Sequence, residues 1–97
     1  MAFVVAAIWK AKEGEEKRVE TVIRELTPLS RAEEKNLFYQ AQVDPEDPGT
    51  FFLYEQYTDA SGYEDHKAAP YFQEKVFGYI LDHLAERSVR TYTTIDA

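Results

Sequence analysis

The chain contains no cysteine, and only four glycines and four prolines are spread over its 97 residues. Without thiols it has no disulfide, no thiolate nucleophile and no thiolate metal site, which fits a reducing compartment. We therefore expect a cytoplasmic protein. Tryptophan and methionine occur once each, whereas there are seven tyrosines and six phenylalanines. These aromatic side chains must fill a core or line a pocket.

Basic residues are also in the minority, because 11 lysines and arginines stand against 18 acids and the formal net charge is −7. The cations are scattered, whereas binding to a phosphate backbone depends on clustered Lys and Arg. We expect no nucleic-acid partner. The apolar run near the N-terminus is far shorter than the roughly 20 residues that a membrane span needs. A membrane partner is therefore not expected either.

Motifs for metals and cofactors are missing from the sequence. The two histidines, His66 and His83, do not form an H-x-x-x-H pair, and the acids of DPEDPG (44–49) lack the spacing of a calcium loop. The glycines stand alone, so there is neither a phosphate-binding loop nor a dinucleotide fingerprint. We expect no metal and no nucleotide cofactor.

A chain of this length builds a single core, so we expect one domain over residues 1–97. β-branched and aromatic residues predict strands over 3–11, 36–43, 51–57 and 88–95. Apolar residues at three- and four-residue spacing predict a helix over 15–31, and two more over about 61–69 and 71–86.

Two local signals refine these boundaries. Ser61 and Glu64 have the spacing of a capping box at the start of the second helix. The segment DPEDPG combines Pro, Asp and Gly, which is turn chemistry for a long hairpin loop between the second and third strands.

The order β-α-β-β-α-α-β is the split βαβ of ferredoxin-like α+β folds, with a four-stranded antiparallel sheet. Helices can cover only one face of this sheet, yet the first and third strands are apolar on both faces. A bare apolar face would be an association patch. We therefore expect a homodimer packed sheet against sheet.

The third strand carries one carboxylate, Glu55, on the same face as Phe51, Leu53 and Tyr57. A buried carboxylate must find a hydrogen-bond donor or stay protonated. One interpretation is that Glu55 meets His66 on the following helix, within hydrogen-bond reach. The alternative is that Glu55 lies at a strand end or dimer rim and pairs with an arginine.

His66 lies between Tyr63, one helical turn earlier, and the break at Pro70. A neutral imidazole there suits a general base that accepts a proton from an acidic substrate hydroxyl near pH 7. The alternative is a partly exposed histidine on a charged helix face, and the spacing alone favours this alternative.

Nearly the whole chain resembles a known family. The matching segments are WKAKEGEEKRVETVIRELTPLSRAEEKNLFYQ (9–40) and DPEDPGTFFLYEQYTDASGYEDHKAAPYF (44–72), and the most specific motifs are F-x-L-Y-E-x-Y-x-D (51–59) and H-x-x-x-P-x-F (66–72). The sequence resembles the antibiotic biosynthesis monooxygenase family and, within it, the small quinol-monooxygenase-like proteins. Such proteins are dimeric ferredoxin-like α/β barrels, in agreement with the expected dimer.

The resemblance implies oxidation of a quinol or polyphenol by O₂ with neither metal nor flavin. It implies His66 as the base, Glu55 as its orienting partner and Asn36 as a hydrogen-bonding group for a substrate oxygen. The implied substrate-binding side chains are aromatic: Trp9, Tyr57, Tyr63 and Phe72.

Two departures from the family pattern affect these expectations. The family usually has E-P-G-N before the second strand, whereas this chain has Glu33-Glu34-Lys35-Asn36. Lys35 replaces the glycine that permits a left-handed turn, so we expect a rebuilt turn and a displaced Asn36. Tyr57 stands where the family often has Trp, and its hydroxyl needs a partner.

Other functions remain open, because one fold supports several chemistries. One alternative is a non-catalytic dimeric module that binds a small aromatic compound. Another is an isomerase of a phosphorylated quorum-sensing signal, for which only Lys10, Lys12 and Arg31 offer cations. Haem degradation would need an axial ligand, and His66 is the candidate.

Overall fold

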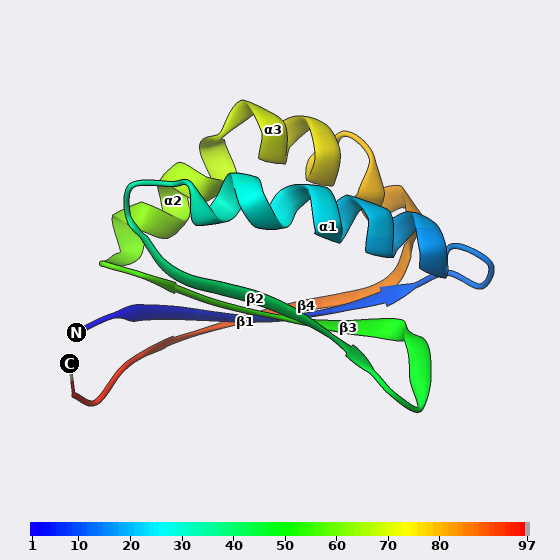
Figure 1. The fold of residues 1–97 in the computed structure, drawn as a ribbon, viewed down its shortest axis with the longest axis horizontal. Coiled ribbons are helices and arrows are strands. Elements are labelled where there is room, and N and C mark those ends of the chain that lie inside the picture. The colour runs from blue at the N-terminus through cyan, green and yellow to red at the C-terminus, as the bar shows by residue number, and fades with distance from the viewer. Residues whose placement is uncertain (97) are drawn as a thin grey trace.

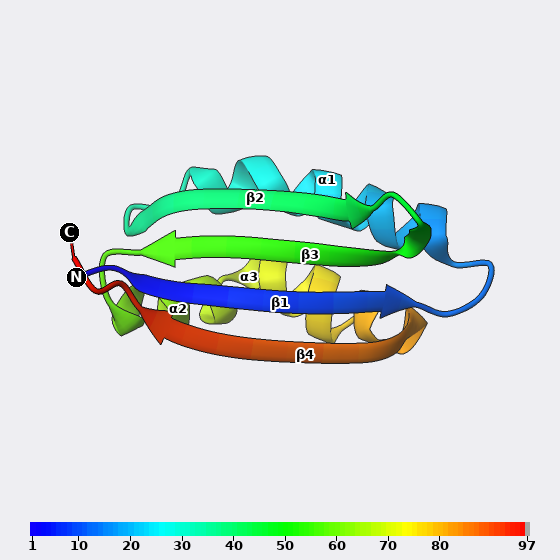
Figure 2. The same cartoon turned by 90° about the horizontal axis from the view of Figure 1, so that it is seen from below.

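The computed structural model describes residues 1–96. One antiparallel sheet with the strand order β2-β3-β1-β4 carries all the helices on one face (Figures 1 and 2). The elements are β1 (Phe3–Ala11), α1 (Glu16–Arg31), β2 (Asn36–Asp44), β3 (Asp47–Tyr57), α2 (Ala60–Ala68), α3 (Pro70–Phe72), a π-helical turn (Gln73–Phe77), a 3₁₀ turn (Ile80–His83) and β4 (Leu84–Thr93). The predicted ferredoxin-like α+β fold is confirmed. None of the helices in residues 1–96 combines the length and the apolarity that crossing a membrane requires.

The helix α1 forms because its apolar residues recur at three- and four-residue spacing on one side. Val19, Val22, Ile23 and Leu26 are buried against the sheet, whereas most of the opposite side is charged and exposed. Figure 2 shows α1 above β2 and β3, while α2 and α3 lie over β1 and β4.

Alternation along the central strands divides the sheet into two faces. On the helix-covered face Val5 lies opposite Glu55, and Trp9 lies opposite Phe51. All four residues are buried. Glu55 therefore shares its face with Phe51, Leu53 and Tyr57, as the alternation predicts.

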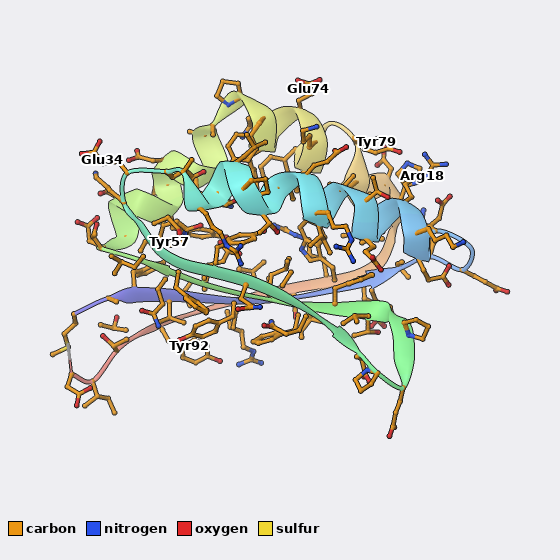
Figure 3. All side chains as sticks on the ribbon, viewed as in Figure 1. Arg18, Glu34, Tyr57, Glu74, Tyr79 and Tyr92 are labelled. Carbon is orange, nitrogen blue, oxygen red and sulfur yellow. The ribbon has the colours of Figure 1, made fainter. Side chains whose placement is uncertain are left out.

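The opposite face of the sheet carries no helix and is rich in apolar side chains. Ile8 pairs with Phe52 at its centre, and these residues are 38% and 36% exposed. Phe38 on β2 and Tyr92 on β4 are also exposed there. Figure 3 shows Tyr92 on the side of the sheet away from the helices, whereas Tyr57 lies between sheet and helices.

Three predicted boundaries are wrong. The segment DPEDPG is not a long loop, because Asp44 pairs with Asp47 and only two residues form the turn. The predicted helix over 71–86 ends early, since Leu84, Glu86 and Arg87 pair with β1. The capping residue of α2 is Asp59, whose carboxylate accepts the N–H of Ser61 at 2.8 Å.

The helical segment after Pro70 is irregular. A π-helical turn spans Gln73–Phe77 and is closed by the Gly78 N–H, which donates to the carbonyl of Gln73 at 2.8 Å. Phe72 and Val76 on this segment are buried in the core. The wide turn therefore keeps both side chains directed at the sheet.

Gly62 sets how closely α2 approaches β3. A Cβ at this position would lie 2.9 Å from the Cβ atoms of Lys35 and Tyr57. Such a contact is too short for carbon atoms, so only glycine fits without a shift of the backbone. The close approach brings His66, one turn later, down onto the sheet.

We predict that Gly62→Ala lowers the free energy of unfolding by about 1–3 kcal/mol, because it overpacks the contact between α2 and β3. Urea unfolding of the full chain measures the change. The control is Ala68→Ser at an exposed position of the same helix, which we expect to change stability by about 0.5 kcal/mol or less. Equal stability of Gly62→Ala and wild type would contradict the packing argument.

Candidate functional site

A small cavity lies between the helices and the sheet. Its volume is about 20 Å³, which is room for roughly one water molecule. The lining residues come from all four strands and from α1, α2 and α3: Val5, Ala7, Trp9, Leu26, Tyr39, Leu53, Glu55, Tyr63, His66, Phe72, Arg87 and Val89. Only Tyr63, Arg87 and Val89 of these are partly or fully exposed, so the cavity approaches the surface between α2 and β4.

His66 is a buried residue of this cavity, with 2% of its surface exposed. Its Nδ1 lies 2.9 and 3.1 Å from the two carboxylate oxygens of Glu33, in the loop after α1. An ionised carboxylate only accepts hydrogen bonds, so Nδ1 carries the hydrogen. In the neutral ring, Nε2 is then the nitrogen that can accept a proton.

Tyr71 lies beside both Glu33 and His66. Its hydroxyl donates to Glu33 and lies 3.3 Å from His66 Nδ1 and 3.2 Å from the hydroxyl of the buried Ser30. Burial, and then the hydrogen bond to Glu33, raise the pKa of the Tyr71 hydroxyl. Tyr71 therefore stays protonated and remains a donor at neutral pH.

Glu55 lies on the other side of the imidazole. Its Oε1 is 3.7 Å from His66 Nε2, which is longer than a hydrogen bond, and it accepts the Tyr57 hydroxyl at 2.6 Å. Burial raises the pKa of Glu55, opposed by the charge of His66 and the hydrogen bond from Tyr57. The predicted Glu55–His66 hydrogen bond is therefore absent, because Tyr57 occupies Oε1 and Glu33 binds the imidazole instead.

The structure brings together most of the expected aromatic side chains. Trp9, Tyr63 and Phe72 line the cavity, and the Phe72 ring centroid lies 4.7 Å from that of His66. Tyr57 does not line the cavity but packs against His66 at 5.7 Å between centroids. The Tyr57 hydroxyl, which was expected to need a hydrogen-bond partner, donates to Glu55.

Asn36 is the expected residue that stays apart. Its Nδ2 donates to the carbonyl of Phe38 at 3.3 Å, and it borders a separate shallow depression with Arg31 and Leu37. The side chain is thus at the start of β2 rather than at the cavity. Asn36 is therefore not among the residues that line the cavity, in contrast to the role that the resemblance implies for it.

The turn before Asn36 is built without a left-handed residue at Lys35, since no non-glycine among residues 1–96 has a positive φ. The Asn36 N–H donates to the Glu33 carbonyl at 3.1 Å, and Lys35 Nζ donates to Ser61 Oγ at 2.7 Å. Lys35 therefore ties the loop to α2 and helps to keep Glu33 beside His66.

Sequence reasoning missed Glu33 as a site residue. The signal was present, because Glu33 is the first residue of the segment that matches the family's E-P-G-N pattern. The departure from this pattern at Lys35 lies two positions later and leaves the acid in place.

Trp9 contributes a polar atom as well as an apolar wall. The residue is 3% exposed, and its Nε1 is buried with no hydrogen-bond partner. Buried indole N–H groups are normally paired.

No group of three His, Asp or Glu side chains within residues 1–96 is arranged to hold a metal ion.

Comparison with known proteins agrees with this architecture. The sequence profile described as antibiotic biosynthesis monooxygenase matches residues 1–76. The chain belongs to this family. The remaining strand, β4, pairs with β1 and so completes the family domain's sheet. No protein of curated function matches the sequence.

Several solved structures share the fold over nearly the full length. A protein described as an antibiotic biosynthesis monooxygenase is 27% identical, with a TM-score of 0.87 and coverage of 99% of this chain and 100% of the other. PA3566 from Pseudomonas aeruginosa is 24% identical, with a TM-score of 0.90 and coverage of 98% and 95%. Rv0793 from Mycobacterium tuberculosis is 15% identical, with a TM-score of 0.91 and coverage of 100% and 98%. The latter two likenesses establish the fold alone.

The raised pKa of Glu55 predicts a pH-dependent stability. The native state holds this proton more tightly than the unfolded chain, whose Glu55 has the ordinary value of 4.5, so the contribution of Glu55 falls as the pH rises from there through the raised pKa. Glu55→Gln keeps an acceptor for Tyr57 and removes the ionisation. We expect the unfolding free energy of Glu55→Gln relative to wild type to rise with pH, measured by urea unfolding from pH 4 upwards. A constant or falling difference would contradict the buried, proton-holding Glu55.

Proposed function

We propose that this protein is a cofactor-independent monooxygenase that oxidises a quinol or polyphenol with O₂ in the cytoplasm. The observation that carries the proposal is the buried His66, with Nδ1 bound to Glu33 and Nε2 left available in an aromatic cavity. Membership of the monooxygenase family supports the reaction class. The aromatic lining supports a ring-shaped substrate.

The proposed first step is removal of a proton from a ring hydroxyl by His66 Nε2. Glu33 fixes the tautomer through Nδ1 and stabilises the imidazolium that forms, and Tyr71 holds Glu33. The nearby Glu55 adds negative charge when ionised, which also favours the protonated ring. The resulting phenolate is electron-rich enough to pass electrons to O₂.

The reaction then balances without a further reductant. One atom of O₂ bonds to a ring carbon, and the other leaves as water with two hydrogen atoms from the substrate. The substrate loses four electrons, two when the ring carbon is oxygenated and two when the ring becomes a quinone. The substrate is therefore the only electron donor that the proposal needs.

The site gives less support to the alternative ligands. For haem, the candidate axial ligand His66 is almost fully buried, and its Nδ1 is already bound to Glu33. For a phosphorylated ligand, Lys10 is paired with Asp47 at 3.0 Å and Arg31 donates to the Tyr39 carbonyl. Neither of these two cations lines the cavity, and Arg87 alone among the lining residues carries a positive charge.

We also propose that the protein acts as a homodimer joined through the helix-free face of the sheet. Four large apolar or aromatic side chains are exposed there: Ile8, Phe38, Phe52 and Tyr92. Covering them removes apolar area from water at about 25 cal/mol per Å². A second copy offers the same face, as a twofold interface requires.

The catalytic proposal predicts that His66→Ala lowers the rate of O₂ uptake with menadiol by about 10²- to 10⁴-fold, the usual contribution of a general base. Glu33→Gln should lower the rate less, because the amide still accepts from Nδ1 but lacks the charge. An oxygen electrode measures both rates above autoxidation, on metal-stripped protein.

Matched controls are available at the surface. Glu34→Gln changes the adjacent acid, which is exposed (Figure 3), and His83→Ala removes the other histidine. We expect both to keep the wild-type rate. If wild type shows no uptake with menadiol or polyphenols but binds them, the protein is a binding module, and the monooxygenase proposal fails.

The dimer is tested separately. Phe52→Lys places a charge at the centre of the helix-free face, and we expect light scattering to fall from twice the 11.2 kDa chain mass to that of one chain. The control is Leu29→Lys, which charges a similarly exposed apolar residue on α1 (41% exposed) and should leave the dimer intact. A wild-type mass of one chain would refute the dimer.

A further inference from the structure

We propose that the indole N–H of Trp9 binds a second oxygen of the substrate, at the end of the cavity away from His66. The inference deepens the proposed function and depends on it for the identity of the cavity as the substrate site. It assigns Trp9 a hydrogen-bonding role beyond that of an apolar wall.

The first argument is the unpartnered donor. Trp9 Nε1 is buried and bonds to nothing within residues 1–96, although the side chain lines the cavity. A buried donor without an acceptor carries the full cost of desolvation. An acceptor in the cavity would offset that cost, so the site favours a ligand that brings an oxygen.

The second argument is the position of Trp9 along the sheet. Glu55 lies opposite Val5 on β1, and Trp9 is four residues further along the same strand. At the usual rise of a strand this separates the two Cα positions by about 13 Å. His66, which lies near Glu55, and Trp9 thus reach the cavity from points that are well separated along the sheet.

The third argument is the chemistry of the two ends. His66 and the carboxylates beside it suit a group that gives up a proton. The Trp9 N–H can only donate, and Arg87, directly opposite Trp9 on β4, is also a donor. The substrate class is therefore a hydroxylated ring that carries an acceptor oxygen on its far side, such as a second hydroxyl, an ether or a carbonyl.

An aromatic substrate ring is larger than a water molecule, so it needs more space than the cavity has in this conformation. Arg87 is the exposed lining side chain where the cavity nears the surface, and its outward movement would enlarge the cavity, whereas the neighbouring Tyr63 is stacked on Phe3 and His66. Trp9, in contrast, is held in the central strand. The N–H of Trp9 therefore keeps its position when the side chains at the entrance of the cavity move.

The test compares two ligands of the same shape, anisole and ethylbenzene, which differ by an oxygen in place of a methylene group. Neither has an acidic proton, so turnover is not involved. We measure both dissociation constants by ligand-observed NMR for wild type and for Trp9→Phe. The affinity ratio of anisole to ethylbenzene should fall about threefold to tenfold in Trp9→Phe, the usual range for one neutral hydrogen bond.

A second readout uses the fact that Trp9 is the only tryptophan. The protein has a single indole N–H resonance in a ¹⁵N-correlated spectrum. Saturation with anisole should shift this resonance in the direction of a stronger hydrogen bond, whereas ethylbenzene should not. This measurement uses wild-type protein and does not depend on how well a variant folds.

Arg87→Met separates the two donors near this end of the cavity. If the preference for anisole is lost in Arg87→Met but kept in Trp9→Phe, the guanidinium is the donor and the inference is overturned. An equal ligand ratio in wild type and Trp9→Phe, with no indole shift, overturns it too. If the preference depends on Trp9 but menadiol gives no O₂ uptake, the inference on Trp9 stands and the monooxygenase proposal alone fails.

Discussion

The interaction on which the site depends is the partly buried hydrogen bond between His66 and Glu33. An imidazole and a carboxylate leave water only when each satisfies the other, because an unpaired buried charge is costly. The two residues lie on different elements, so their pairing fixes the loop after α1 against α2. Lys35 reinforces the same contact through Ser61, and Gly62 lets the helix come close enough. The same residues therefore pack the loop against α2 and hold the imidazole of His66 in position.

The two faces of the sheet differ because successive side chains along each strand point to opposite faces. Trp9 points to the cavity, whereas its neighbour Ile8 belongs to the helix-free face. The same holds for Glu55 and Tyr54 on β3. Because the two faces share every backbone hydrogen bond of the central strands, a shift of one strand would change the cavity and the exposed apolar surface together. The sheet's register is thus the common constraint on both.

Much of the fold was predictable because its signals are local. The strand over 3–11 and the helix after it follow from periodicity, and the element order then selects the topology. The predicted boundaries are wrong where strand pairing between residues distant in sequence overrides the local signal. Leu84 and Glu86 favour helix locally but pair with β1, and Pro48 and Gly49 read as loop although the backbone there already belongs to β3. The contact of Glu33 with α2 is also long-range, so the one sequence signal for this residue was its place at the start of the segment that matches the family's E-P-G-N pattern.

The π-helical turn at Gln73–Phe77 has a consequence for how the family domain can vary in length. A π turn holds one more residue than an α turn while the chain enters and leaves in nearly the same direction. Phe72, before the turn, packs on His66, and Ile80, after it, is fully buried. Deletion of one residue between these two anchors would turn the π turn into an α turn, so Phe72 and Ile80 could keep their places. A variant one residue shorter at this point would therefore keep the wall of the cavity.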